Sequence, residues 1–397
     1  MALLDKMGNP QKTFRSVHVA GSNGKGSTAS FVSNIALVAG LRTALYTSPH
    51  LNDFRERIRL DGKMISRESL VDATGRVREL YDPERTTFFE FTTALAFDCI
   101  CCFKPDLAVI EVGLGGRLDA TNTLCPEVSI ITDISLEHQD YLGDTITAIA
   151  REKAGIMKPL TPVVTGASRA DARRVIHEEA QRMACPVREF GRDFRSVRTG
   201  NNSFGYESGH MKLNDIQLSM FGANQVKNAG LAIAAVEELT KVGFSIGEDD
   251  IRTGIFRTKF PGRFELLKTN PDVIIDGAHT VEGMRLLRST LRSLYPNRKV
   301  FLLLGMLRDK NWQELVQIIA PIAHEIMCVP PQSNRALDPE ELFGLVGTFG
   351  VPVAHSERIE DGFQYLVSRA GREDIVVAAG SLYMIGPVRS ACGYQDV

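Results

Sequence analysis

The stretch that most constrains this chain is HVAGSNGKGST at residues 18–28. Val17, His18 and Val19 predict the end of a buried strand, while Gly21 and Gly24 predict a tight turn. From Ser27 onward the apolar residues recur at helical spacing. The sequence therefore predicts a strand, a glycine-rich loop and a helix in direct succession, which is typical of an α/β fold.

The glycine-rich loop has the chemistry of a phosphate-binding site. Its backbone N–H groups converge on one point, and the start of the following helix adds about half a positive charge. Lys25 supplies a full positive charge, and the hydroxyl of Ser27 is placed to hold Mg²⁺ against the phosphates. The spacing is shorter than the common G-x-x-x-x-G-K-S/T pattern, and the alternative is a tight loop that only joins strand and helix. Because the lysine, the hydroxyl and both flanking elements agree, the sequence favours a nucleotide phosphate site.

The composition excludes several classes of protein. The 397 residues exceed one ordinary core and predict two domains. A formal net charge of −2 gives no electrostatic reason to expect a nucleic acid or a membrane as partner. No apolar run is long enough to cross a bilayer, and the first residues lack a signal-peptide pattern, so we expect a cytoplasmic protein. Seven scattered cysteines argue against a disulfide framework, and Cys99, Cys101 and Cys102 lie in an apolar helical run that predicts buried free thiols.

Polar residues follow three further predicted strands at the point where each strand ends. They are Ser48 after residues 43–46, Glu111 within residues 107–112, and His138 after residues 128–132. Because the carboxyl ends of parallel strands share one edge of a sheet, these side chains and Ser27 should face the same crevice. A lone buried carboxylate such as Glu111 must be paired or bound to a metal. The alternatives are a turn serine before Pro49 and a hydrogen-bonded structural histidine. As ligands these side chains favour Mg²⁺, and the imidazole indicates that Mn²⁺ is tolerated.

Two other segments are placed to meet a substrate. Residues 87–90 stand at a loop–helix junction, where a flat aromatic ligand would stack and meet a carboxylate; core packing of the aromatic residues is the alternative. The segment GLGGRLDATN at residues 113–122 offers Arg117 and Asp119, either to a ligand or to each other as a staple of the loop. Lys153 lies in a predicted helix, and its pattern alone indicates a solvated lysine.

From about residue 260 the pattern changes to repeated strand–helix units. Buried strands are predicted at residues 273–276, 300–304, 325–329 and 375–379. We therefore predict an N-terminal domain of residues 1–260, whose residues 187–221 add short antiparallel strands, and a smaller α/β domain of residues 261–397. Arg263 and Asp276 should overlook a cleft between the two domains, although Arg263 is equally well explained as a surface turn residue.

Nine motifs give the chain a resemblance to a known family. They are HVAGSNGKGST, TSPHL, EVGLGGRLDATN, EHQDYLG, REKAGI, PGRFE, DGAH, GMLRDK and GSLYMIG. In this order they resemble the Mur ligase family of ATP-dependent amide ligases, and within it the folylpolyglutamate synthase and dihydrofolate synthase branch. The resemblance covers nearly the whole chain. It implies a P-loop-type ATPase domain with a mostly parallel sheet, followed by a smaller Rossmann-like α/β domain.

The resemblance also implies roles for individual residues. Those that match the family's ATP site are Ser22, Asn23, Gly24, Lys25, Gly26, Ser27, Asn228, Arg263, Asp276 and His279. Those that match its sites for one or two Mg²⁺ ions are Ser27, Ser48, Glu111, His138 and Lys153, the last as a carbamylated lysine formed with carbon dioxide. The segments that hold a pterin match Thr87, Phe88, Phe89, Glu90, Leu118, Asp119 and Ala120. The chain departs from the family pattern at Thr280, where the motif DGAHN has asparagine, and at Asn224, where a histidine precedes Gln225.

The activity implied is ligation of L-glutamate to a folate or dihydropteroate carboxylate through an acyl phosphate. Lys25, Lys153 and His138 are the expected catalytic residues, ATP and Mg²⁺ the expected cofactors, and small molecules the expected partners of a monomer. Two rivals stay open: a Mur-type ligase for a different carboxylate, and a nucleotide-binding module without catalysis. Phe88 and Phe89 speak against a peptidoglycan-type substrate. The joint presence of the predicted metal ligands speaks against a non-catalytic module.

Overall fold

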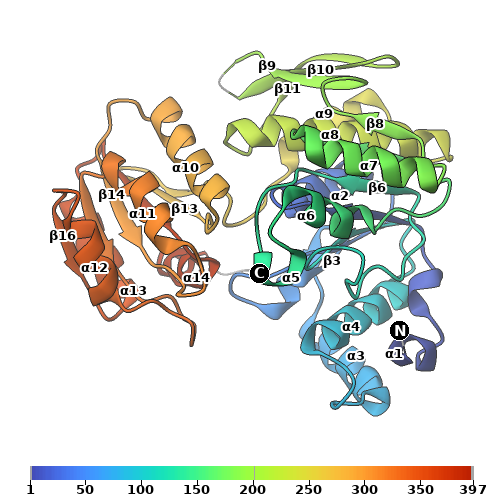
Figure 1. Cartoon of the computed structure of the whole chain (residues 1–397), viewed down its shortest axis with the longest axis horizontal. Helices are drawn as coiled ribbons and strands as arrows, with labels where there is room; N and C mark the ends of the chain where they lie inside the picture. The colour runs from blue at the N-terminus through green and yellow to red at the C-terminus, as the bar shows by residue number, and fades with distance from the viewer. Residues whose placement is uncertain (1, 201, 395–397) are drawn as a thin grey trace. The chain divides into compact units, whose positions relative to one another are not determined.

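The computed structural model describes residues 2–200 and 202–394, which form two compact units (Figure 1). The N-terminal unit contains Met1–His50, Phe54–Ser219 and Asn224–Lys259. The C-terminal unit contains Phe260–Val397 together with two short segments from the earlier part of the chain, Leu51–Asp53 and Met220–Ala223. Both units are α/β structures with mostly parallel sheets, which confirms the predicted fold class.

The N-terminal unit is built on an eight-stranded sheet with the order β4-β3-β2-β5-β1-β6-β7-β8. Its strands are β1 (Ser16–Ala20), β2 (Thr43–Tyr46), β3 (Ile58–Leu60), β4 (Lys63–Met64), β5 (Leu107–Glu111), β6 (Val128–Ile131), β7 (Val163–Thr165) and β8 (Val187–Glu189). β1, β2, β5, β6, β7 and β8 run parallel, while β3 runs antiparallel to its neighbours β2 and β4. Asp61 and Gly62 turn the β3–β4 hairpin with φ of 47° and 76°, the left-handed conformation that such tight turns require.

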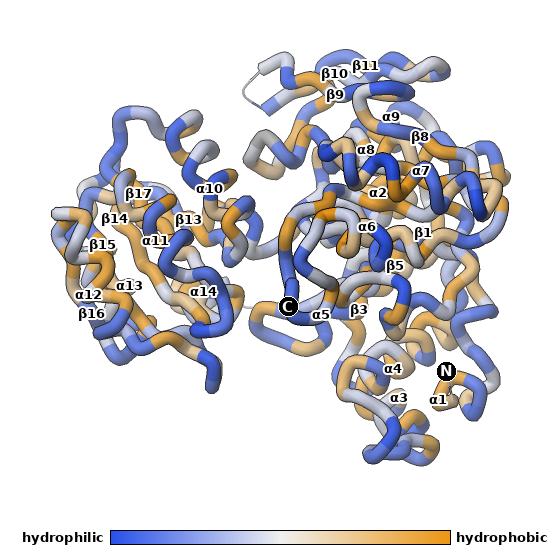
Figure 2. The backbone as a smooth tube through the Cα atoms, in the orientation of Figure 1, coloured by the Kyte–Doolittle hydropathy of each residue, from blue (hydrophilic) through white to orange (hydrophobic). Residues whose placement is uncertain are grey.

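Helices enclose this sheet through separate apolar clusters. They are α1 (Ala2–Lys6), α2 (Lys25–Val38), α3 (Arg67–Leu80), α4 (Phe88–Phe103), α5 (Gln139–Leu142), α6 (Ile146–Ala154), α7 (Ala170–Arg182), α8 (Ala223–Lys241) and α9 (Glu248–Arg257). One cluster contains Phe97 of α4 and Ile110 of β5, and another contains Ile149 of α6 and Ile131 of β6. Figure 2 shows that α7 is amphipathic, with hydrophilic and hydrophobic residues alternating along the helix. The apolar faces of the helices therefore pack on the sheet and hold its strands in place.

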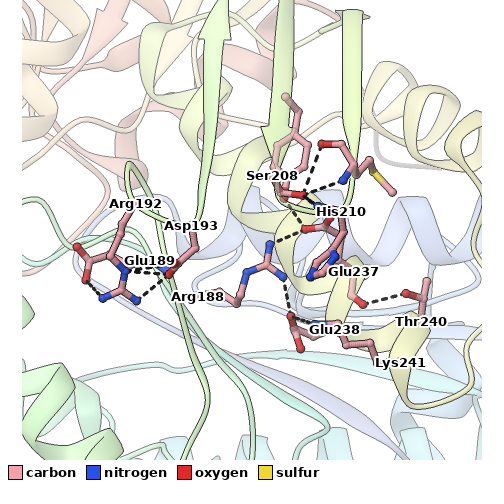
Figure 3. A network of polar contacts seen from close by, with 12 residues as sticks. Arg188, Glu189, Arg192, Asp193, Ser208, His210, Glu237, Glu238, Thr240 and Lys241 are labelled. Carbon is pink, nitrogen blue, oxygen red and sulfur yellow. Dashed lines mark hydrogen bonds and ion pairs between the residues drawn. The ribbon is translucent and has the colours of Figure 1, made fainter.

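A separate antiparallel sheet of β9 (Phe194–Arg198), β10 (Ser203–Ser208) and β11 (Lys212–Gln217) is tied to α8 by a buried polar network (Figure 3). Arg188 of β8 donates to Glu237 and Glu238 of α8 at 2.8 Å each. From β10, the hydroxyl of Tyr206 donates to Glu237 at 2.7 Å and that of Ser208 at 2.6 Å. Each buried carboxylate is thus paired, which offsets the cost of removing it from water. The network fixes α8, whose first turn reaches the glycine-rich loop.

The C-terminal unit is built on a six-stranded sheet with the order β12-β13-β17-β14-β15-β16. Its strands are β12 (Glu265–Lys268), β13 (Asp272–Asp276), β14 (Val300–Leu304), β15 (Glu325–Cys328), β16 (Val353–His355) and β17 (Ile375–Ala379). Its helices are α10 (Val281–Leu294), α11 (Trp312–Ile319), α12 (Pro339–Gly347), α13 (Ile359–Arg369) and α14 (Leu382–Ala391). All strands except β12 run parallel to their neighbours. The central strands β14 and β17 are buried along their whole length, as is typical of a parallel sheet covered on both faces. Figure 2 shows the hydrophobic residues of this unit gathered along its strands.

Two predictions about individual segments are wrong. Residues 187–189 do not begin an antiparallel set, because β8 pairs parallel to β7 and extends the main sheet. A strand this short carries too few residues for its pattern to reveal its partner.

The predicted burial of the three clustered cysteines is only partly right. Cys102 is exposed and Cys101 is half-buried, so that only Cys99 of this cluster is a buried thiol. Among the described residues, no helix is long and apolar enough to cross a membrane.

Candidate active site

The residues that follow four neighbouring strands lie at one edge of the N-terminal sheet. β2, β5, β1 and β6 are adjacent and parallel, so that their carboxyl ends meet at the same edge. Hydrogen bonds join the segments beyond them. Ser48 N donates to Glu111 Oε2 at 3.1 Å, and Ser22 N donates to Asp133 O at 2.8 Å. The structure thus brings the glycine-rich loop, Ser48 and Glu111 together.

The glycine-rich loop is shaped to receive an anion. Gly24 is left-handed, with φ 86° and ψ 0°, and α2 begins at Lys25. A side chain at Gly24 would place its Cβ 2.4 Å from Asn228 Oδ1, so that only glycine fits here. Lys25 Nζ donates to Gly21 O at 3.0 Å and to Ser22 O at 3.4 Å. Carbonyl oxygens do not neutralise the ammonium, and its charge remains available to a phosphate group.

The first turn of α8 supports this loop. Gln225 Nε2 donates to Ser27 Oγ at 3.3 Å, and Asn228 Nδ2 donates to Gln225 Oε1 at 3.1 Å. All three side chains are buried. A serine oxygen has two lone pairs, so that Ser27 keeps one for a cation after accepting from Gln225. Asn228, a predicted nucleotide contact, therefore lies beside the loop.

Glu111 and the neighbouring hydroxyl groups have the chemistry of a site for a hard cation. The Glu111 side chain lies at the end of β5 and is buried, with 4% of its surface exposed. Carboxylate and hydroxyl oxygens are the ligands that Mg²⁺ prefers. In the part of the chain that the structure describes, no group of three or more His, Cys, Asp or Glu side chains gathers as a metal site. A cation at this edge would therefore depend on Glu111, hydroxyl oxygens and the phosphates of a nucleotide.

Lys153 is buried, so the solvated lysine indicated by its pattern is wrong. Its side chain is 1% exposed, and Nζ donates to Glu137 Oε1 at 2.6 Å and to Gly21 O at 2.9 Å. Burial lowers the pKa of Lys153 to about 8, although Glu137 opposes this shift. Burial also disfavours the ionised form of Glu137, but Lys153 and Lys25 outweigh it and lower the pKa of Glu137 to about 2. Lys153 thus reaches the phosphate loop, and its partner Glu137, which opens the EHQDYLG motif, is a site residue to which the sequence assigned no role.

His138 lies on the same loop as Glu137. It precedes α5, its side chain is exposed, and its backbone is left-handed with φ 46°. This conformation is uncommon for residues other than glycine and often marks a functional loop. The predicted metal ligand therefore lies next in sequence to the residue that pairs with Lys153.

A pocket of about 550 Å³ lies within the N-terminal unit, lined by residues of α1, α4 and the loop after β5. Four predicted substrate residues line it, namely Glu90, Leu118, Asp119 and Ala120. Its wall also includes residues that the sequence did not single out, among them Leu3, Leu4 and Lys158. Most of the lining residues are polar or charged, and the apolar ones are leucines and alanines, so that a pocket of this volume suits a small organic ligand that carries polar groups.

The other predicted substrate residues, Thr87, Phe88 and Phe89, do not line this pocket. Thr87 and Glu90 form a capping box at the start of α4, where the Glu90 carboxylate accepts from Thr87 N and Oγ1 at 2.8 Å each. Phe88 is 68% exposed. The ring of Phe89 lies against Gly113, where an added Cβ would be 2.2 Å from ring atom Cζ. Thr87 and Glu90 thus start the helix and Phe89 packs on the loop, while contact of this segment with a substrate stays a prediction.

The loop after β5 is stapled to α6, but not by a pair between Arg117 and Asp119. Arg117 Nη2 lies 2.8 Å from Glu152 Oε1, and Arg117 N donates to Glu152 O at 2.7 Å. Asn122 Nδ2 donates both to Arg117 O at 3.0 Å and to Gly155 O at 2.9 Å. The loop that lines the pocket and the helix that carries the buried lysine thus form one rigid body.

In the C-terminal unit, three predicted residues gather at the end of β13. Asp276 accepts from two backbone N–H groups, one of them Phe264 N at 2.9 Å. Burial raises the pKa of Asp276, and neighbouring Arg263 opposes this shift. His279 Nδ1 lies 2.7 Å from Gly277 O, which assigns the ring proton to Nδ1. The group sits at the carboxyl end of a parallel strand, a place where α/β sheets bind ligands.

Comparison with known proteins identifies the family. The family model of the Mur ligase middle domain matches residues 19–236, and that of the Mur ligase glutamate ligase domain matches residues 262–382. The chain belongs to the Mur ligase family. The first match contains both the phosphate loop and the loop that lines the pocket. Within the Mur ligase family, the chain falls in the folylpolyglutamate synthase and dihydrofolate synthase branch.

Individual members of this branch align over almost the whole chain. The dihydrofolate synthase/folylpolyglutamate synthase of Bacillus subtilis is 34% identical, over 98% of this chain and 92% of its own length. The structure of Escherichia coli FolC in complex with DHPP and ADP has a TM-score of 0.92 and 27% identity, covering 99% of this chain and 92% of that one. The bifunctional folylpolyglutamate synthase/dihydrofolate synthase of Yersinia pestis, complexed with AMPPNP and Mn ion, has a TM-score of 0.89 and 27% identity, covering 99% and 92%.

Proposed function

We propose that the chain is an ATP-dependent ligase that joins L-glutamate to the carboxylate of a pteroate or a folate. The observation that carries this proposal is the edge of the N-terminal sheet, where the phosphate loop, buried Glu111 and buried Lys153 lie together. A pocket of about 550 Å³ opens in the same unit. The matched middle and glutamate ligase domains support the same class of reaction. We also propose that the ligase acts as a monomer on small molecules.

ATP and a divalent cation are the cofactors that this edge fits. Relatives in the branch are known with ADP, and with AMPPNP and Mn ion. In this chain, Lys25, the loop amides and Asn228 would hold the phosphates. Ser27, Ser48 and Glu111 would hold one cation, and His138 with Lys153 would hold a second one, which when bound offsets the repulsion between the γ-phosphate and a substrate carboxylate.

The reaction needs an activated carboxylate. A carboxylate does not react with an amine at neutral pH, because its leaving group would be oxide. Transfer of the γ-phosphate to a carboxylate oxygen releases ADP and gives an acyl phosphate, and attack by the glutamate amine then forms the amide and releases phosphate. Lys25 and the loop N–H groups lie where negative charge moves during this transfer. Preorganised donors of this kind are worth about 3–4 kcal/mol each.

We further propose that Lys153 acts as a carbamate. Carbon dioxide adds only to a neutral amine, and the lowered pKa of Lys153, about 8, leaves about a tenth of the amine neutral at pH 7. The ammonium form pairs with Glu137. A carbamate would carry the opposite charge and would turn from this carboxylate toward a cation, so that the ion pair and the carbamate are alternative states of one side chain.

The pocket is the proposed site for the pterin ring. Asp119 provides a carboxylate in the pocket wall, and Leu3 and Leu4 provide apolar contact. A pterin offers a flat ring for these leucines and an N–H group for the carboxylate. The substrate carboxylate would then extend from the pocket toward the phosphate loop.

The test is turnover by the purified chain with ATP, Mg²⁺, L-glutamate and one pterin carboxylate at a time, with products weighed by mass spectrometry. We expect dihydropteroate, a reduced folate or both to gain one glutamyl residue while ADP and phosphate appear in equal amounts. The Lys25→Ala variant is the control, because it keeps the pocket and loses the phosphate contact. ATP turnover that needs a different carboxylate would reassign the substrate, and no turnover with any acid would contradict a ligase.

A further inference from the structure

His18 is a buried polar residue that the reaction described above does not use. It lies in the middle of β1, and its side chain has 0% of its surface exposed. Nε2 lies 2.8 Å from Thr121 Oγ1, while Nδ1 has no hydrogen-bond partner among the described residues. An unpaired buried acceptor costs about 1–3 kcal/mol, a cost that valine or isoleucine would not incur in a strand. Because Nδ1 makes no hydrogen bond, any contribution of His18 that offsets this cost must come from the hydrogen bond at Nε2.

Hydrogen bonds of the Thr121 hydroxyl link His18 to Asp119. The hydroxyl of Thr121 is fully buried and donates to Asp119 Oδ1 at 2.5 Å. Because a hydroxyl has one proton, its bond with His18 must be one that it accepts, which assigns the imidazole proton to Nε2. Thr121 N donates to the same oxygen at 2.9 Å. The direction of donation thus runs from His18 through Thr121 to Asp119.

Asp119 is the end of this relay and lies in the wall of the pocket. Its other oxygen, Oδ2, accepts from Leu114 N at 2.9 Å, so that both oxygens are oriented by the protein. Burial raises the pKa of Asp119, and the bonds from Thr121 and the loop amides oppose this shift. Burial also lowers the pKa of His18 to about 3, so that the imidazole is neutral at physiological pH and donates through one nitrogen only.

We propose that His18 is a positioning residue that orients the pocket carboxylate Asp119 through the hydroxyl of Thr121, and thereby sets the affinity for the pterin ring. The inference rests on the proposed function. Oδ1 already accepts two hydrogen bonds from Thr121, so a ligand N–H group would bind at Oδ2. A carboxylate that cannot rotate binds such a donor better than one that rotates, because the bond then forms without loss of side-chain freedom. His18 touches neither substrate nor nucleotide, and it affects only the binding of the pterin substrate.

The test compares variants that keep or remove the relay. Thr121→Val removes the hydroxyl at nearly constant volume, and Thr121→Ser keeps it. His18→Leu removes the donor at Nε2, and His18→Gln restores an N–H at similar reach. We expect Thr121→Val and His18→Leu each to raise KM for the pterin substrate about tenfold, with KM for ATP unchanged, while the serine and glutamine variants stay close to wild type. The double variant should cost no more than either single one.

Thr258→Val is the matched control. Thr258 is another fully buried threonine of the N-terminal unit, and its hydroxyl donates to the backbone of Gly254, which is not a site residue, at 2.7 Å. Its variant should leave KM for the pterin unchanged. An unchanged pterin KM in Thr121→Val, or a parallel rise in KM for ATP, would overturn the positioning role.

Nitrogen NMR of the histidine side chains separates this inference from the proposed function. We expect the free protein to show a histidine that is protonated at Nε2 and stays neutral through mildly acidic pH, with its signal lost in His18→Gln and shifted in Thr121→Val. Absence of this tautomer would refute the relay, whatever the substrate is. Its presence without any pterin turnover would instead contradict the proposed function alone.

Discussion

Lys153 shows that burial can give a residue a role that its sequence pattern does not predict. By its pattern it is a helix lysine with no special role, yet the folded chain buries all but 1% of its side chain and aims Nζ at the end of β1. The cause lies outside its own helix, because Glu137 and Gly21 supply its partners. Lys153 became a candidate only through its resemblance to a known motif.

The carbamate proposal makes a prediction for Lys153 variants. Lys153→Ala should lose most ligase activity, and added short carboxylates should partly restore it, because they supply the negative group that the carbamate provided. Lys153→Arg keeps the positive charge beside Glu137 but forms no carbamate, and it should be as inactive as the alanine variant. Initial rates of ADP release measure both effects.

Lys25→Ala is the control for this rescue, since Lys25 has no proposed carbamate and added carboxylates should not restore it. Circular dichroism would establish that each variant folds, because removing Lys153 leaves Glu137 buried without its cation. High activity in Lys153→Arg would show that the ion pair, and not the carbamate, is what the enzyme needs.

His18 gives the stability of the protein a specific dependence on pH. Its pKa in the folded protein is about 3, below the ordinary value of 6.5, so that the folded protein excludes a proton that the unfolded chain binds. The stability due to the neutral imidazole is complete above pH 6.5 and falls as the pH is lowered toward 3. His18→Gln does not titrate, so its deficit relative to wild type should shrink by about 1 kcal/mol between about pH 6.5 and about pH 5.5.

Urea unfolding followed by far-ultraviolet circular dichroism measures this difference. The fluorescence of the single tryptophan is unsuitable, because Trp312 lies in the C-terminal unit. A constant difference between wild type and His18→Gln across this range would mean that His18 titrates normally in the folded protein.

At the scale of elements, two glycines let the loop after β5 dock on α6. A Cβ at Gly116 would lie 2.7 Å from Glu152 O and 3.2 Å from Lys153 Cα, and a Cβ at Gly155 would lie 2.4 Å from Arg117 Cβ. Neither glycine has a positive φ, so it is close approach that requires them, not backbone conformation. The loop and the helix therefore touch backbone to backbone.

Gly155→Ala should separate the loop from the helix. The added Cβ meets backbone and Cβ atoms of Arg117, which cannot move without moving the loop, so we expect a loss of about 1–3 kcal/mol in stability and a lower rate of ligation. Gly75→Ala is the matched control, because Gly75 lies inside α3 with no atom within 4 Å of its added Cβ. Thermal melting should place that variant at or above wild type. Equal effects of the two substitutions would argue against close docking.

The pair between Arg117 and Glu152 should matter more for activity than for stability. Its side chains are 56% and 21% exposed, and pairs of this kind contribute less than about 1 kcal/mol. Glu152→Gln should therefore melt close to wild type but raise KM for the pterin roughly three- to tenfold, because the pocket loop loses its orientation. Steady-state kinetics would measure this change.

Glu179→Gln offers the comparison for this variant, since Glu179 pairs with Arg182 on α7 and is 24% exposed. Its KM should not change. A Glu152→Gln enzyme with the wild-type KM would show that the backbone contacts alone position the loop.

The elements that the sequence predicted are those with strong local signals. The strand, glycine loop and helix at residues 16–38 follow from apolar periodicity and turn residues, and the polar residues after β2 and β5 follow from the rule for parallel sheets. At residues 87–90 the Thr-x-x-Glu pattern is a capping box that starts α4, and Glu90 also lines the pocket, so that contact of this segment with a substrate stays a prediction. Nothing local indicated that Phe89 would pack on Gly113.

At the scale of the whole molecule, the site is assembled from contacts between distant parts of the chain. The pocket joins α1 to a loop more than a hundred residues later, and α8 returns to place Gln225 on Ser27. Pairings over such distances depend on tertiary packing, which periodicity does not encode. The place of Leu3 and Leu4 in the pocket and the pairing of Glu137 with Lys153 were therefore not predicted. The polar residues at the edge of the parallel sheet were predictable, whereas most residues that line the pocket beside it were not.

The central claim is that this edge activates a carboxylate by phosphoryl transfer. The most direct measurement uses a pterin substrate whose carboxylate carries a heavy isotope of oxygen, with ATP, Mg²⁺ and L-glutamate. If an acyl phosphate forms, one labelled oxygen leaves with the phosphate for each amide made, and mass spectrometry should find label and product in equal amounts. Amide formation with unlabelled phosphate would contradict the account.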